Sequence, residues 1–246
     1  MSRFSGVFLN IGLGVALAGG LVYSSMVVTR SLERIRGTVE VKGYAERKMK
    51  ADYATWNIVV AARNSDLAQA YISLEKHKDE VIAFLKEAQI KDAEIDVKNI
   101  SKETLYKRDV QGNRLTDVGS FELLQEVSIT ASDIEKIKEL ALKIGSLGVK
   151  GIEVEPRSPQ YLIQREKLEK VKVELLAEAT RSAKERADQF ALNSGTSIGR
   201  LVSARQGVFQ VTAENSTDVD DYGTYDTRST DKIVKIVVTL SYTTGE

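Results

Sequence analysis

Residues 52–88, DYATWNIVVAARNSDLAQAYISLEKHKDEVIAFLKEA, decide how the chain folds. Apolar residues alternate with other types over Asp52–Arg63, which predicts a strand with one buried face. The Asn-Ser-Asp run at 64–66 supplies side chains that cap helices. Apolar residues then recur at helical spacing over 67–88 and predict a long amphipathic helix, with His77 on or beside its apolar face. The stretch therefore predicts a strand followed directly by a helix.

The same kind of pattern continues beyond this stretch. The next predicted elements are two strands of a hairpin, a second helix and another strand, at residues 95–107, 121–129, 134–144 and 152–155. Ser132 and Glu135 have the spacing of a capping box, and Gly148 and Gly151 break the second helix. The order over 52–155 is therefore β-α-β-β-α-β, which is the order of a ferredoxin-like unit.

The C-terminal part predicts one more helix and two strands. The helix, about Gln164–Asn193, carries a narrow alanine-rich stripe that lets another element approach closely. Residues 198–211 read as a strand with a break at Gly207, and the polar, acidic residues 213–231 read as a loop. The last strand, 232–243, is apolar on both faces, which is typical of a central or covered strand.

An uncharged segment precedes all of these elements. The apolar residues 7–28 would measure about 33 Å as a helix, close to the thickness of the hydrocarbon core. This predicts a single transmembrane helix that contacts membrane lipid. A cleaved signal peptide is the alternative, because Ala16-Leu17-Ala18 resembles a cleavage site. Gly12, Ala16 and Gly20 share a face of small residues that favours helix–helix packing in a membrane.

These patterns together predict an α+β protein. We divide it into an anchor or signal segment with its juxtamembrane residues (1–36) and one domain (37–246). Within that domain, residues 52–155 form the ferredoxin-like unit, and residues 161–246 add the long helix and the C-terminal strands. A retained anchor predicts a single-pass protein of the inner (cytoplasmic) membrane, with its C-terminal domain outside the cytoplasm, in the periplasm.

Composition excludes several kinds of chemistry. Lys+Arg and Asp+Glu are both 35, so the formal net charge is zero and no basic excess indicates nucleic-acid binding. The chain has no cysteine, which removes disulfides, thiolate nucleophiles and cysteine-ligated zinc. The single histidine, His77, would have to carry any triad or multi-histidine metal site. We therefore expect no cofactor.

Four segments carry a resemblance to a known family. They are Val39–Ala45 (VEVKGYA) followed by Asp52-Tyr53-Ala54, Phe121–Ile129 (FELLQEVSI), the alanine-rich run from Ala177 to Leu201, and Val237–Tyr242 (VVTLSY). Over about 39–242 the chain resembles the SIMPL domain family (DUF541, periplasmic immunogenic protein-like). The resemblance implies an envelope protein without assigned catalytic residues. Some bacterial relatives form large ring-shaped homo-oligomers, others are associated with tolerance of oxidative stress, and an animal relative has a kinase signalling partner.

Two candidate sites are weak on sequence grounds. A catalytic His77 would need a nucleophile and an orienting acid beside it, so a packed histidine at the edge of the core is the favoured interpretation. Asp218, Asp220 and Asp221 partly match a calcium loop. Such a loop needs an oxygen ligand at its fifth position and a glutamate at its twelfth, where this chain has Tyr222 and Ser229. A solvated acidic loop is favoured there.

The sequence leaves two main hypotheses on function, and a third, an enzyme that depends on His77, is the least favoured. The first is a non-catalytic structural or interaction module that self-associates as a homo-oligomer, with a role in the envelope or in oxidative stress. The second is an envelope module that binds a small molecule or a cation, with residues 213–231 as a lid. No catalytic residue is assigned under either hypothesis.

Overall fold

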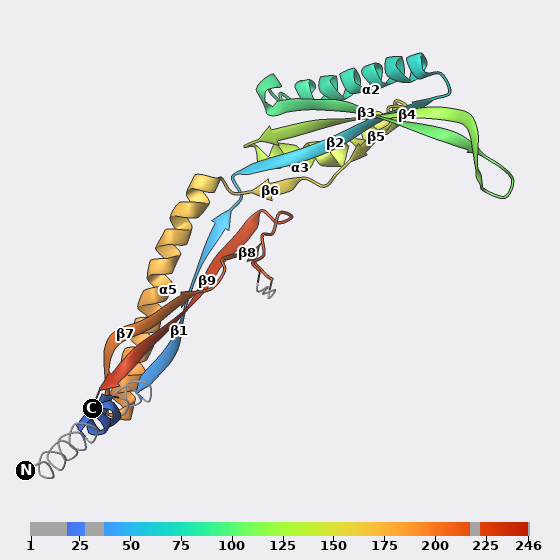
Figure 1. Cartoon of the computed structure of the whole chain (residues 1–246). Coiled ribbons are helices and arrows are strands. Elements are labelled where there is room, and N and C mark those ends of the chain that lie inside the picture. Colours follow the sequence, from blue (N-terminus) through green and yellow to red (C-terminus); the bar gives the residue numbers. More distant parts are fainter. Residues whose placement is uncertain (1–18, 28–36, 217–221, 246) are drawn as a thin grey trace, which may run out of the picture. The chain divides into compact units, whose positions relative to one another are not determined.

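The computed structural model describes residues 19–27, 37–216 and 222–245. They form a mixed α+β structure with two antiparallel sheets (Figure 1). The chain divides into two compact units. Unit 1 contains Met1–Glu46, Val173–Phe209 and Lys235–Glu246, and unit 2 contains Arg47–Lys172 and Gln210–Val234.

The N-terminal segment is described only over residues 19–27, which are helical. Within the described ranges, no helix is long and apolar enough to cross a membrane. Most of the predicted anchor over 7–28 lies outside these ranges. Gly12 and Ala16 lie outside them as well, whereas Gly20 belongs to the helical residues 19–27.

Unit 2 is built on a sheet in the order β3-β4-β2-β5, with β6 also paired to β2. Its strands are β2 (Tyr53–Asn64), β3 (Ile95–Arg108), β4 (Arg114–Ala131), β5 (Val154–Pro156) and β6 (Gln160–Leu162). Its helices are α2 (Leu67–Glu87), α3 (Ile134–Lys143), the short α4 (Gly145–Val149) and the single 3-10 turn η1 (Asp92–Glu94). β2 pairs antiparallel with β4 and with β5, and β3 pairs antiparallel with β4, so the predicted hairpin is confirmed.

The core of unit 2 lies against one face of this sheet. Trp56, Ile58 and Val60 alternate along β2 and are almost fully buried, in one cluster with residues of β4, α2, α3 and α4. The helices α2 and α3 therefore cover the same face of the sheet, which confirms the single buried face predicted for β2. The Trp56 indole Nε1 donates to the carbonyl of Arg157 at 2.8 Å, so its one polar group is satisfied.

The helix boundaries of unit 2 correct two predictions. Asp66 caps α2 as expected, because its carboxylate accepts from the backbone of Gln69. The cap of α3 is Asp133 rather than Ser132, since the Asp133 side chain accepts from the backbone of Lys136. Gly148 does not end the second helix but lies inside α4, and the chain leaves α4 at Gly151, whose φ is +79°.

Unit 1 is a helix packed on a second sheet. Its strands follow the order β1-β9-β7, and β8 also pairs with β9. The elements are β1 (Thr38–Lys50), α5 (Arg165–Ser194), β7 (Ser197–Gln206) and β9 (Asp231–Gly245), of which β1, α5 and β9 also contribute residues to unit 2. β8 (Gln210–Ala213), although paired with β9, lies wholly within unit 2. Figure 1 shows α5 running alongside the three strands. The central place predicted for the last strand is confirmed.

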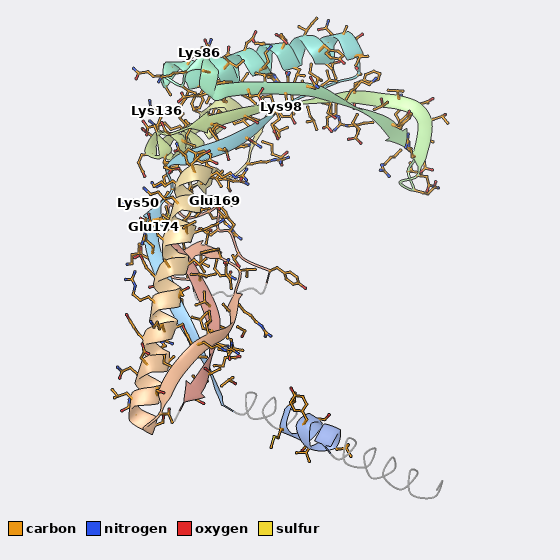
Figure 2. All side chains as sticks on the ribbon, turned by 60° about the vertical axis from the view of Figure 1, so that its left-hand side comes forward. Lys50, Lys86, Lys98, Lys136, Glu169 and Glu174 are labelled. Carbon is orange, nitrogen blue, oxygen red and sulfur yellow. The ribbon has the colours of Figure 1, made fainter. Side chains whose placement is uncertain are left out.

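The alanine-rich stripe of α5 forms the helix side of the unit 1 core. Leu175, Ala179, Ala183 and Ala187 are completely buried. Charged residues occupy the outside of α5, where Figure 2 shows Glu169 and Glu174 projecting from the helix. Small side chains bring the helix axis close to the sheet, so the buried stripe sets the distance between the two layers.

Candidate interaction surface

The helix and the sheet of unit 1 approach each other closely at Gly43. A Cβ atom built on this residue would lie 2.0 Å from the carbonyl oxygen of Ala179 and 2.6 Å from the backbone nitrogen of Ala183. Both partners are backbone atoms of α5, which do not move without moving the helix. The face of β1 that carries Val41, Gly43 and Ala45 therefore packs on α5, and we call it the helix face of the sheet.

The outer edge of β1 is the first part of the candidate surface. Thr244 N donates to Gly37 O at one end of β1, and Ala51 N donates to Thr230 O at the other. β1 and β9 are thus antiparallel, and the odd-numbered residues of β1 bond to β9. The even-numbered residues direct their N–H and C=O groups outward, and the Lys42 carbonyl accepts there from Nη1 of Arg186 at 3.0 Å.

A hollow of about 620 Å³ runs beside this edge. Glu40, Val41 and Lys42 of β1 form one side, and residues 182–193 of α5 form the other. Within it, Phe190 leaves 61% of its surface exposed. We call this hollow the edge groove. It has the layout of sites in which an extended segment adds to a sheet beside a helix, because main-chain groups lie on one side and side chains on the other.

The opposite edge of the same sheet, strand β7, is exposed on both faces. Leu201 and Val202 expose 49% and 54% of their surfaces. Leu201 lies opposite Tyr242 and Ala204 lies opposite Leu240, both on the helix face, but α5 does not bury them. Between α5 and Tyr242 runs a second groove of about 510 Å³, lined also by Val173, Leu176 and Thr180 among others.

A buried ion pair organises the C-terminal loop in unit 2. The Lys232 side chain is fully buried, and its ammonium donates to the carbonyl and the carboxylate of Asp226. Burial alone would raise the pKa of Asp226, but hydrogen bonds from Ser229, the Arg228 N–H and Lys232 outweigh it and lower that pKa to about 2. Burial lowers the pKa of Lys232, and the neighbouring carboxylate opposes this shift.

The predicted lid, residues 213–231, includes the Asp226 carboxylate of this ion pair. Asp218, Asp220 and Asp221 are outside the described residues. Residues 222–231, which follow them, are bound to β8 by hydrogen bonds between Val211 and the backbone of this segment. In the described ranges, no group of three acidic or histidine side chains is arranged to hold a metal ion.

The structure gives His77 a packing role. Its Nδ1 lies 2.8 Å from the carbonyl oxygen of Ala61 in the neighbouring strand β2. This contact links α2 to the sheet and occupies the ring nitrogen that faces the protein. The structure therefore agrees with the interpretation that the sequence favoured, a packed histidine at the edge of the core.

Comparison with known families settles the kinship of the chain. A family described as SIMPL, protein of unknown function (DUF541), matches residues 39–242. The chain belongs to the SIMPL family. None of the curated proteins compared with this SIMPL chain matches it.

Solved structures add nothing to this assignment. A candidate transcriptional repressor of the glycine cleavage system is 12% identical, with a TM-score of 0.20, and the alignment covers 77% of this chain and 80% of that one. An unknown protein from Galdieria sulphuraria is 12% identical, with a TM-score of 0.21, and the alignment covers 77% and 83%. Such TM-scores carry no information on fold or function.

Two positions of the SIMPL motifs have structural explanations. Gly43 has no side chain, so the backbone of α5 can lie against it, as described above. Asp52 binds the start of α5, because one carboxylate oxygen accepts from Gln164 N at 2.8 Å and the other lies 3.3 Å from Nζ of Lys167. Asp52 therefore acts as a helix cap supplied by a residue that is distant in sequence.

Replacing Asp52 tests this capping role. Asp52→Ala removes the acceptor for Gln164 N, and we expect the free energy of unfolding to fall by about 1–2 kcal/mol. Asp52→Asn keeps an acceptor oxygen and loses only a half-exposed ion pair, so the loss should stay below about 0.5 kcal/mol. Urea denaturation of the full-length chain measures both variants. Equal losses would show that the ion pair, rather than the cap, carries the effect.

The sequence did not reveal the edge groove or the exposure of β7. The alanine stripe indicated that some element approaches the helix, but not that this element is Gly43. Arg186 looks like an ordinary surface residue of a helix. The predicted apolar stripe ends at Phe190 and Ala191, of which the structure buries Ala191 and leaves Phe190 exposed. The residue types of β7 could have indicated its exposure, because Leu201 and Val202 are adjacent apolar residues in a strand without apolar–polar alternation.

Proposed function

We propose that this chain is a non-catalytic interaction module of the cell envelope that self-associates as a homo-oligomer. In this proposal residues 7–28 hold it at the inner membrane and the SIMPL domain lies outside the cytoplasm. The observation that carries the proposal is strand β7, an edge strand that exposes Leu201 and Val202. Exposed apolar edge strands are templates for pairing with another chain, and proteins that stay monomeric usually protect them.

The protection of β7 is incomplete. The register with β9 shifts between Ile198 and Leu201 and again before Ser203, which bends the first half of the strand. From Ser203 to Gln206 the pairing is regular, and this half contains no proline and one charged residue, Arg205. It therefore retains the geometry needed to add a further strand.

We also assign the segment from β2 to β5 to the ferredoxin-like arrangement. Support comes from the strand order β3-β4-β2-β5, in which neighbouring strands are antiparallel, and from the two helices on one face. β6 is an addition to that arrangement. Under this assignment unit 2 is a separately packed body, and the exposed strand belongs to unit 1.

Self-association is tested by the molar mass of the full-length chain in mild detergent. Size-exclusion chromatography with light scattering should give a protein mass above the 27.2 kDa of one chain. Val202→Lys places a charge on the exposed edge strand and should weaken association by about tenfold, which corresponds to ~1.4 kcal/mol. The matched control is Val149→Lys, at a valine that is 91% exposed on α4.

The control should leave the mass unchanged, because Val149 lies in unit 2 and on a helix. The membrane segment is identical in both variants, so their difference reports on the strand alone. A wild-type chain that stays monomeric at every concentration would contradict the proposal.

A further inference from the structure

The two edges of the unit 1 sheet run in the same direction. β1 is antiparallel to β9 by the hydrogen bonds at its two ends, and β7 is antiparallel to β9 by its register. β1 and β7 are therefore parallel to each other, with β9 between them. A second copy of the sheet placed beside the first, in the same orientation, brings β7 of one copy next to β1 of the other.

Each edge has main-chain groups available for such pairing. Along β1 the even-numbered residues point outward, and among them the Lys42 carbonyl is bound by the Arg186 side chain. Along β7 the bond from Gly207 N to Val237 O fixes which residues face β9, so that Ala204 and Gln206 direct their backbone groups outward. In the described part of the chain, no strand pairs with either outer edge.

The side chains of the two edges are complementary in shape. The edge groove beside β1 has a helix wall with Phe190 exposed but holds no strand. β7 is a strand with Leu201 exposed on the helix face but has no helix above it. A β7 strand placed along β1 would put the apolar side of Leu201 beneath the α5 residues of the edge groove. The edge groove thus supplies a helix for β7, and β7 supplies a strand for the edge groove.

The charges of the two edges match in part. The charged residues of β7 are Arg200 and Arg205, both basic. The unit 1 part of β1 carries Glu40 and Glu46 with Lys42 between them, and the edge groove is lined by Glu185 and Arg186. Arg205 lies opposite Thr239, on the face away from α5, and the even-numbered glutamates of β1 point to that same face. Opposite charges at neighbouring strand positions favour this pairing over β7 with β7.

We propose that β7 of one copy adds as a parallel strand to the β1 edge of a second copy, inside the edge groove. The inference rests on the self-association proposed above and identifies its two surfaces. An N–H group of the incoming strand would replace the Arg186 guanidinium at the Lys42 carbonyl. Because the two surfaces differ, the contact is head-to-tail, and each copy keeps one free groove and one free strand. Such contacts propagate and produce rings when the rotation closes.

Engineered cysteines test this contact directly, because the natural chain has none. On the face away from α5, Ser203→Cys marks β7, and Glu40→Cys, Lys42→Cys and Tyr44→Cys mark β1 in three possible registers. Chains with single cysteines are mixed in detergent, oxidised mildly and separated on non-reducing gels. The control for β1 is Lys102→Cys, at a lysine on β3, the edge strand of the other sheet.

We expect Ser203→Cys to form a disulfide-linked dimer with at least one of the three β1 variants and none with Lys102→Cys. A chain carrying both cysteines of the successful pair should give a ladder of higher multimers, because the contact propagates. Dimers that Ser203→Cys forms with itself in preference would indicate β7–β7 pairing and overturn the inference.

Light scattering on the same samples separates the two proposals. Oligomers without any link between positions 203 and 40, 42 or 44 overturn the strand-in-groove contact and leave self-association standing. A monomer at every concentration overturns both. Because each cysteine replaces an exposed side chain, thermal unfolding of each variant should match that of the natural chain.

Discussion

Gly43→Ala should lower the stability of unit 1 more than the addition of a single methyl group at any other position of the chain. The new Cβ would lie 2.0 Å from Ala179 O, 2.6 Å from Ala183 N and 2.7 Å from Ala183 Cβ. Two of these three atoms belong to the helix backbone, so no side-chain rotation relieves the overlap. The helix must move away from the sheet and lose contacts along its stripe. We expect a loss of about 3 kcal/mol, at the upper end of the range for overpacked cores.

Two further variants sharpen this prediction. Gly148→Ala adds the same methyl group inside α4, where nothing lies within 4 Å, and should raise stability by about 0.5–1 kcal/mol. Adding Ala183→Gly to Gly43→Ala removes the Cβ contact but leaves the contact with Ala179 O. The double variant should therefore stay destabilised. Recovery of the wild-type urea midpoint would place the strain in side chains and contradict our account.

The second large effect is expected at Lys232. Lys232→Met removes a buried ammonium and leaves the carboxylate of Asp226 without its charged partner, which should cost about 3 kcal/mol. Lys50→Met is the matched control, because Lys50 lies 3.8 Å from Asp231 of the same loop but is 84% exposed. An exposed pair of this kind contributes about 0–1 kcal/mol. Urea denaturation at pH 7 compares the two.

The fall of stability in acid should depend on the same ion pair. The pKa of Asp226 is about 2 in the folded chain, below its ordinary value of 3.8. Its stabilising contribution is therefore complete above about pH 5 and is lost as the pH falls through the folded pKa of about 2, by about 2 kcal/mol in total. In Asp226→Asn this part of the pH dependence should be missing. An identical decline of stability in the variant and the natural chain would show that other carboxylates cause it.

Much of the fold was predictable where one face of an element is buried. In β2 the alternation around Trp56 reports a single buried face, and in α2 the cap at Asp66 precedes a clear apolar stripe. The start of α3 at Ile134 was predicted, but its cap was assigned to the wrong residue because Ser132 and Asp133 are equally good caps by residue type. Only the hydrogen bond to Lys136 N distinguishes them, and that bond depends on the local backbone path.

The candidate surface was less predictable because it depends on residues that are distant in sequence. The alternation of residues 38–44 predicts a short strand that ends at Gly43, but β1 continues to Lys50. Pairing with β9 extends it, as the bond from Ala51 N to Thr230 O shows. The edge groove likewise needs Lys42 and Arg186 to meet across 144 positions of the chain. No local pattern encodes either contact.

The alanine stripe of α5 also has a thermal consequence. Ala179, Ala183 and Ala187 are completely buried, yet each hides little apolar surface, whereas Trp56 and Ile58 in unit 2 hide much more. The heat capacity change of unfolding grows with the apolar area that water reaches. Unit 1 should therefore have a flatter dependence of stability on temperature than unit 2. In unit 1 the packing of α5 on the sheet depends more on close backbone contact than on the hydrophobic effect. The hydrophobic effect weakens on cooling, whereas close backbone contact changes little between a cold and a warm environment.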